Sequence, residues 1–213
     1  ALRNNKKENT INTTLEFHCP TRIVHGLGSA ARLGSEVKAL GGRRVLIVTD
    51  AGIAQAGLLE PLQDSLAAAV QLCHEEKVDA VVTIGGGSAL VVGKAVAAIA
   101  TNGGTLGDLQ GAANLAKPPL SMIAIPTTAG SGSEVSAAIP YYDEIRGRKT
   151  GTRSPHFFPE VAILDATLIE TMPVSQGVLS GVDALTHAME AYLTVRATPI
   201  TDALALAAIR LLT

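Results

Sequence analysis

Two residues whose side chains bind divalent metals lie four positions apart towards the end of the chain. They are Asp183 and His187, within GVDALTHAMEAY over residues 181–192. This stretch has no proline and ends in good helix formers, and residues four apart on a helix share one face. A carboxylate oxygen and an imidazole nitrogen could then bind one metal ion from the same side. An isolated Asp-x-x-x-His pair is more often structural, with the acid in an early helical turn and the histidine packed against neighbours, so the rest of the sequence must decide.

A glycine run follows a predicted buried strand. The strand AVVTI, residues 80–84, leads directly into Gly85-Gly86-Gly87-Ser88, and a helix is predicted over residues 89–100. Glycines between a strand and a helix start allow backbone N–H groups to approach a phosphate, because no Cβ intervenes. Ser88 adds a hydroxyl donor. The run is not GxGxxG and a tight turn is the alternative, but the strand before it and the helix after it favour phosphate binding.

A second loop rich in donors follows the next predicted strand, MIAI at residues 122–125. It reads PTTAGSGSE over residues 126–134 and includes Thr127 and Thr128. A polar helix cap, with Glu134 near the positive end of a helix, is the alternative interpretation. Two such loops at successive strand ends nevertheless indicate one shared crevice, because parallel sheets bind ligands beyond the carboxyl ends of their strands.

An acidic residue follows a third strand. Residues 45–48, VLIV, form a continuous apolar run typical of a strand buried on both faces, and Asp50 comes two residues after it. A carboxylate at this position can accept hydrogen bonds from ribose hydroxyls and would repel the extra phosphate of NADP. Asp50 could equally cap the following helix.

Composition supports an α/β protein. Of 213 residues, 47% are hydrophobic and 17% charged, enough for a sizeable core with one large domain or slightly more. The net charge of -2 gives no basic surface and argues against nucleic acid as a partner. Two cysteines are too few for a disulfide framework. No apolar run is long enough for a membrane span, and the polar N-terminus lacks the apolar core of a signal peptide. We therefore expect a cytoplasmic protein that does not enter a membrane.

The remaining pattern divides the chain into three parts. We expect a flexible tail at 1–14, a Rossmann-like parallel-sheet nucleotide-binding domain at 15–173 and the beginning of an all-helical domain at 174–213. Within the second part the pattern predicts short strands at 15–17 and 22–25, a helix at 30–40 with Ser29 as N-cap, a hairpin over 137–152 and a strand at 161–165. Residues 53–77 read as one long helical segment or as two abutting ones, where a doubly wound fold would normally return to the sheet. The last helix begins with a cap at Thr198 and Pro199, and its apolar face has nothing to bury it.

Together these motifs resemble the iron-containing (group III) alcohol dehydrogenase family. PTTAGSGSE and GVDALTHAMEAY are highly specific, and the order and spacing match from Phe17 onward. The other matching pieces are Val48-Thr49-Asp50, Gly85-Gly86-Gly87-Ser88 with Lys94 on the following helix, Gly147-Arg148-Lys149 and Val161 to Asp165.

The resemblance implies reversible oxidation of a small alcohol to an aldehyde or ketone, with hydride passing to NAD, in a protein that forms a dimer at full length. It implies that the adenine ribose is bound by Asp50, the pyrophosphate by Gly86, Gly87 and Ser88, further parts of NAD by Thr127 and Thr128, and that Lys149 lines the nucleotide site. It also implies a divalent metal, Fe²⁺ or alternatively Zn²⁺, bound by one Asp and three His. Asp183 and His187 match the first two of these ligands.

Three departures from the family pattern limit how far the family's functional residues can be assigned to this chain. The other two histidine ligands lie further along in the family, and this sequence ends before them. The family pattern GGGSxxDxxK has Asp where this chain has Val91, and the strand expected near residues 69–71 is missing. These departures keep an inactive or binding-only homologue open as the alternative. A hydroxyacid–oxoacid transhydrogenase, a glycerol dehydrogenase or a dehydroquinate-synthase-like enzyme of the same fold also remains open.

Overall fold

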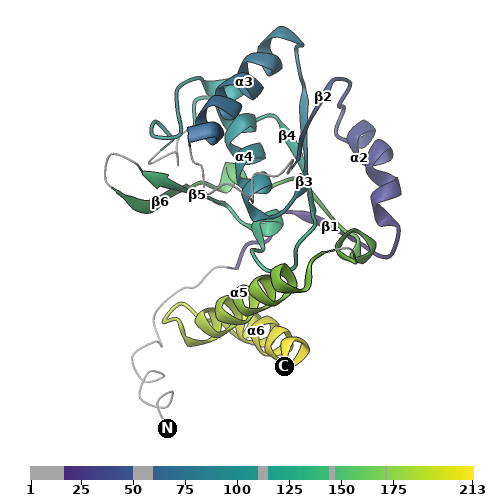
Figure 1. Cartoon of the computed structure of the whole chain (residues 1–213), viewed down its shortest axis with the longest axis vertical. Coiled ribbons are helices and arrows are strands. Elements are labelled where there is room, and N and C mark those ends of the chain that lie inside the picture. The colour runs from purple at the N-terminus through teal and green to yellow at the C-terminus, as the bar shows by residue number, and fades with distance from the viewer. Residues whose placement is uncertain (1–16, 50–59, 110–114, 144–146, 171) are drawn as a thin grey trace.

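Five parallel strands form the central sheet of the protein. The computed structural model describes residues 17–49, 60–109, 115–143, 147–170 and 172–213 (Figure 1). The spatial order of the strands is β1 (Arg22–His25), β7 (Val161–Leu164), β4 (Ser121–Pro126), β3 (Ala80–Gly85) and β2 (Val45–Thr49). Every pairing among them is parallel. The predicted α/β class with a Rossmann-like parallel sheet is therefore confirmed.

Helices cover both faces of this sheet (Figure 1). Along β3, Val81 packs with α3 (Glu60–Glu75) and α4 (Gly87–Asn102), whereas Val82 packs on the side of α2 (Leu33–Ala39). Successive side chains of a strand point to opposite faces, so one apolar run supplies two cores. The central strands β3, β4 and β7 are consequently buried between two helical layers.

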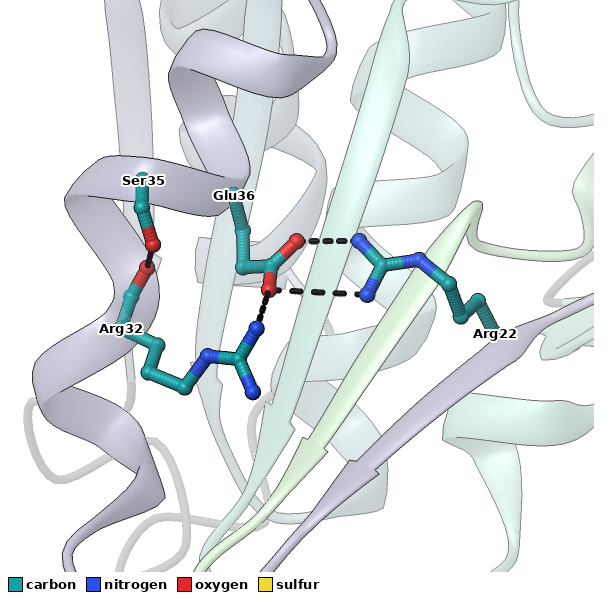
Figure 2. Close-up of polar contacts among 4 residues, drawn as sticks. All are labelled: Arg22, Arg32, Ser35 and Glu36. Carbon is teal, nitrogen blue, oxygen red and sulfur yellow. Dashed lines mark hydrogen bonds and ion pairs between the residues drawn. The ribbon is translucent and has the colours of Figure 1, made fainter.

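A charged cluster ties α2 to β1. The buried Glu36 carboxylate of α2 accepts hydrogen bonds from the guanidinium of Arg22 on β1 and lies 3.2 Å from Nη2 of Arg32, in the 3₁₀ turn η1 (Ser29–Arg32), as Figure 2 shows. The Arg22 hydrogen bond, with a smaller contribution from Arg32, lowers the pKa of Glu36.

The N-cap of η1 is Gly28, which has a φ of 72°. The prediction that Ser29 is the N-cap is therefore wrong. Ser29 is instead buried, with its hydroxyl donating to the Leu164 carbonyl at 3.4 Å.

The edge strand β2 differs from the prediction of a strand buried on both faces. Its residues are half-buried or exposed, and Ile47 is 56% exposed. Within the described ranges β2 pairs only with β3, so its other edge has no neighbour. The strand itself is confirmed, but the prediction that it is buried on both faces is wrong. An apolar run shows the composition of a strand and does not show whether another strand lies beside it.

The long helical segment is present as α3, which runs without interruption from Glu60 to Glu75; residues 53–59 of the predicted segment lie outside the described residues. Leu66 and Cys73 of α3 are buried against α4. The predicted hairpin is also present, as β5 (Ala138–Asp143) and β6 (Arg148–Arg153).

Two helices complete the described chain, α5 (Val174–Leu193) and α6 (Pro199–Leu212). They lie beyond the carboxyl ends of the strands (Figure 1). Thr198 caps α6 in a capping box with Thr201, as predicted. The apolar face predicted for α6 is largely uncovered, with Ile200, Leu204 and Leu211 exposed, whereas Ala205 is buried. None of the helices in the described ranges has the length and apolar character needed to cross a bilayer.

Helix α4 approaches β3 so closely that a side chain larger than hydrogen at Gly93 has no room. A Cβ at Gly93 would lie 1.9 Å from Cγ2 of the buried Thr83. We predict that Gly93→Ala lowers the free energy of unfolding by about 1–3 kcal/mol, the usual effect of overpacking. Gly34→Ala in α2 is the matched control, because a Cβ there meets nothing within 4 Å. The control should leave stability unchanged or raise it by up to ~1 kcal/mol. Equal urea midpoints for the two variants would contradict the prediction.

Candidate nucleotide and metal site

The two loops predicted to share a crevice are in contact. The pairing of β3 with β4 continues to Gly85 and Pro126, and the Thr127 N–H donates to the Gly85 carbonyl at 3.0 Å. Further along, a Cβ at Gly87 would lie 2.8 Å from both Cβ and Oγ of Ser131. The glycine loop, residues 85–88, therefore needs Gly87 because the hydroxyl loop, residues 127–134, packs directly against it.

The glycine loop leads into a helix start that suits an anion. Gly86 is the N-cap of α4, which runs for 16 residues from Gly87 and has no acidic residue in its first turn. The first N–H groups of a helix have no partner within it, and the helix dipole favours negative charge there. Gly86 and Gly87 are half-buried and Ser88 is exposed. A diphosphate could thus be bound by backbone donors, with the Ser88 hydroxyl at the open side.

Helix α5 contacts the hydroxyl loop close to the predicted metal ligands. A Cβ at Gly130 would lie 2.5 Å from the carbonyl oxygen of Ser180, which is buried in α5. Asp183 follows Ser180 by one turn, and its Oδ1 lies 3.8 Å from Nε2 of His187. Both side chains are 52% exposed, so they share one accessible helix face as the spacing indicated. The glycine loop, the hydroxyl loop and α5 consequently form a continuous surface.

The described residues contain only part of a metal-binding set. Nowhere in the described ranges do three or more His, Cys, Asp or Glu side chains lie close enough together to bind a metal ion. The carboxylate and imidazole of Asp183 and His187 fit the chemistry of a divalent ion such as Fe²⁺ or Zn²⁺ as two of its ligands. Two protein ligands alone leave most of the coordination sphere to other groups.

Four further residues were predicted for the nucleotide site, and the structure describes three of them. Thr127 and Thr128 are half-buried in the hydroxyl loop, whereas Lys149 is exposed on β6 of the hairpin. Asp50 lies outside the described residues. Val91, which replaces the family's Asp, is half-buried and packs on the apolar cluster between α3, α4 and β3.

Asp165 is a residue whose importance the sequence did not reveal. It is buried at the end of β7, and its carboxylate accepts the N–H groups of Gly28 at 3.0 Å, Ala30 at 2.9 Å and Thr167 at 3.1 Å, and the Thr167 hydroxyl at 2.8 Å. These hydrogen bonds, that of Ala30 foremost, lower the pKa of Asp165 to about 2. In the turn that follows β1, the backbone N–H groups of Gly28 and Ala30 are therefore already bound to the Asp165 carboxylate. An acid immediately after a strand was the only signal in the sequence.

Comparison with known proteins identifies the family of the chain. The sequence model of iron-containing alcohol dehydrogenase matches residues 20–70 and 60–166, and that of the C-terminal part of the Fe-containing alcohol dehydrogenase family matches residues 177–213. The chain belongs to the iron-containing alcohol dehydrogenase family. The two matches to the first family model overlap within α3, which is where the sequence predicted that a strand of the family is missing.

Curated members of the family are similar over most of this chain. The chain is 35% identical to the NAD-dependent methanol dehydrogenase of Bacillus methanolicus over 92% of its own length and 57% of the relative. It is 37% identical to the sulfoacetaldehyde reductase of Bilophila wadsworthia, over 89% of this chain and 55% of that protein. The chain thus spans little more than half the length of these relatives.

Solved structures of the family have the same fold. A 1,3-propanediol oxidoreductase superposes with a TM-score of 0.85 at 30% identity, over 94% of this chain and 58% of that one. The sulfoacetaldehyde reductase of Bifidobacterium kashiwanohense, in complex with NAD+, gives a TM-score of 0.82 at 28% identity, over 94% of this chain and 59% of that one.

The hydrogen bonds of Asp165 make a prediction about acid stability. Its pKa lies near 2 in the folded protein against an ordinary 3.8, so its contribution to stability is present above about pH 4 and is lost as the pH falls towards 2. Asp165→Asn should unfold at lower urea concentration at pH 7, and the gap from the unsubstituted protein should persist to about pH 4 and narrow below it. A gap of the same size at pH 3 as at pH 7 would show that the carboxylate charge is not the cause.

Proposed function

We propose that this chain is the nucleotide-binding part, with the first two metal ligands, of an NAD-dependent alcohol dehydrogenase that acts on a small alcohol or aldehyde. The observation that carries the proposal is the contact of the glycine loop with the hydroxyl loop at Gly87 and Ser131, next to the contact of Gly130 with α5. These contacts support a binding site for NAD and for a metal on one surface. The similarity to a methanol dehydrogenase described as NAD-dependent points the same way.

In this proposal the chain's own groups bind and orient the cofactor. Gly86, Gly87 and Ser88 hold the pyrophosphate at the start of α4, and Thr127 and Thr128 donate to further parts of NAD from the adjacent loop. Asp50 accepts from the adenine ribose hydroxyls and Lys149 lines the nucleotide site, as the family resemblance suggests. Asp183 and His187 provide two ligands to a divalent ion, Fe²⁺ or Zn²⁺. When bound, the metal supplies Lewis acidity towards an alcohol oxygen and NAD supplies the hydride acceptor.

The division into a nucleotide-binding domain at 15–173 and the beginning of a helical domain at 174–213 belongs to the same proposal. So does a dimer of the full-length protein. The division is supported by the sequence pattern, in which helices alone follow residue 173, and the dimer by the family resemblance.

A binding-only homologue is the second candidate. Val91 favours it, because an apolar side chain packed between helices replaces a carboxylate of the family pattern. This candidate binds NADH without any dependence on metal and has no dehydrogenase activity in any longer form of the protein.

A fluorescence titration with NADH tests the proposal. We expect the purified chain to bind NADH, and Gly87→Ala to raise the dissociation constant at least about tenfold, because the new Cβ must displace the Ser131 side chain. Gly34→Ala is again the matched control and should bind as the unsubstituted chain does. We further expect negligible alcohol-dependent NADH formation by this chain alone, with or without ferrous ion, since it supplies only two metal ligands.

Two results would contradict this account. If the folded chain does not bind NADH, the proposed nucleotide site is refuted. Measurable alcohol oxidation by this chain, purified from a host free of alcohol dehydrogenase, would show that the ligand set is complete without further residues.

A further inference from the structure

A buried lysine links the helix that starts at the glycine loop to the end of the hydroxyl loop. Lys94 of α4 is only 2% exposed, and its Nζ donates to the carbonyl oxygens of Ser136 at 2.7 Å and Ala138 at 3.3 Å. Ser136 and Ala138 lie just after the hydroxyl loop, where the chain enters β5. The contact spans 42 residues of sequence and joins two segments that the sheet itself does not pair.

Among the described residues, the charge on Lys94 is attracted to the carboxylate of Glu134. Burial lowers the pKa of Lys94 to about 8, and the Glu134 carboxylate of η4 (Ser133–Val135) opposes this change. Burial likewise raises the pKa of Glu134, with Lys94 acting against it. In the part of the chain that the structure describes, the titratable groups that line the same cavity as the lysine are His156 and Glu160. Glu160 is already engaged, because its Oε2 accepts the Met122 N–H at 2.7 Å.

With this link the hydroxyl loop is held at three places. Its beginning is held by the Thr127 N–H to Gly85 hydrogen bond, its middle by the contact of Ser131 with Gly87, and the residues just after its end by Lys94. The first two contacts hold the loop to the glycine loop, and the third holds it to the body of α4. Because α4 also carries the phosphate-binding helix start, loop and helix become one unit.

We propose that Lys94 is a positioning residue of the nucleotide site, which sets the hydroxyl loop at the distance from the start of α4 that a bound dinucleotide requires. The proposal rests on the proposed NAD binding and adds to it a residue that does not touch the cofactor. Lys94 acts through the Ser136 and Ala138 carbonyls and through its attraction to Glu134.

Stability alone is a weak reason for an ammonium group at this position. Burying a charge carries a desolvation cost, and a buried ion pair that is replaced as a whole by apolar groups of similar size often leaves stability unchanged or raised. If Lys94 had a merely structural role, its replacement by methionine would change the stability of the chain and leave the NADH affinity of the folded protein unchanged. If Lys94 positions the loop, the replacement also weakens NADH binding, because the orientation of the loop depends on directed hydrogen bonds.

The test compares Lys94→Met with Lys117→Met in the whole chain, using NADH as the probe. Lys117 is an exposed lysine outside both loops and serves as the matched control. We expect Lys94→Met to raise the NADH dissociation constant about tenfold, as for loss of hydrogen bonds from a charged donor, and to lower the urea midpoint at pH 7, because Glu134 and the two carbonyl oxygens lose their buried partner. Lys117→Met should match the unsubstituted chain in both measurements.

A pH series supplies a readout that a structural role would not move. Between pH 7 and pH 9.5 Lys94 loses its charge, because its pKa is near 8, so the unsubstituted chain and Lys117→Met should bind NADH several-fold more weakly at pH 9.5. Lys94→Met should show no such change. If Lys94→Met does not fold, the weakening in the other two chains still tests the proposal.

The outcomes separate this proposal from the proposed function. If the unsubstituted chain does not bind NADH at all, the nucleotide site itself is refuted. If that chain binds NADH but Lys94→Met binds it equally well, or if affinity is flat from pH 7 to pH 9.5, the positioning role of Lys94 is refuted and NAD binding stands.

Discussion

The close packing of α4 on β3 is the constraint on which the candidate site depends. Gly93 allows the helix to approach Thr83, and this approach sets where the first turn of α4 and its glycine loop lie relative to the sheet. Parallel pairing of β3 with β4 then brings the hydroxyl loop beside the glycine loop. Helix α5 reaches the same place through Gly130, so Asp183 and His187 come within the same surface. Close contacts at Gly93, Gly87 and Gly130 thus link the sheet to the proposed chemistry.

Features with a local cause could be predicted from the sequence. Strands β3 and β4, the loops after them and the helix face shared by Asp183 and His187 follow from short-range patterns, and the structure has them where the patterns indicated. The role of Asp165 could not be predicted, because its partners Gly28 and Ala30 lie more than 130 residues away in the chain. The contacts of Lys94 could not be predicted either. Its position in a motif was visible, but its hydrogen-bond acceptors are backbone carbonyls, which every residue has.

The half-exposed strand β2 and the uninterrupted helix α3 have a common explanation. An apolar strand such as Val45–Thr49 normally has neighbours on both sides, and here one edge is bare among the described residues. The family model matches this chain in two pieces that overlap within α3. Loss of the strand that the family has near this point would join two helices into one and leave β2 at the edge. Val91 packs against the apolar cluster that contains α3, so two of the three departures from the family pattern lie in one region.

The central claim is that the glycine loop and the hydroxyl loop bind one dinucleotide as a single unit. Amide chemical shifts of the ¹⁵N-labelled chain during titration with NADH test it most directly. The account predicts that Gly86, Gly87 and Ser88 shift together with Thr127 and Thr128, along one binding curve, while the amides of α2 on the opposite side of the sheet do not move. Shifts confined to one of the two loops, or two loops that follow different binding curves, would contradict it.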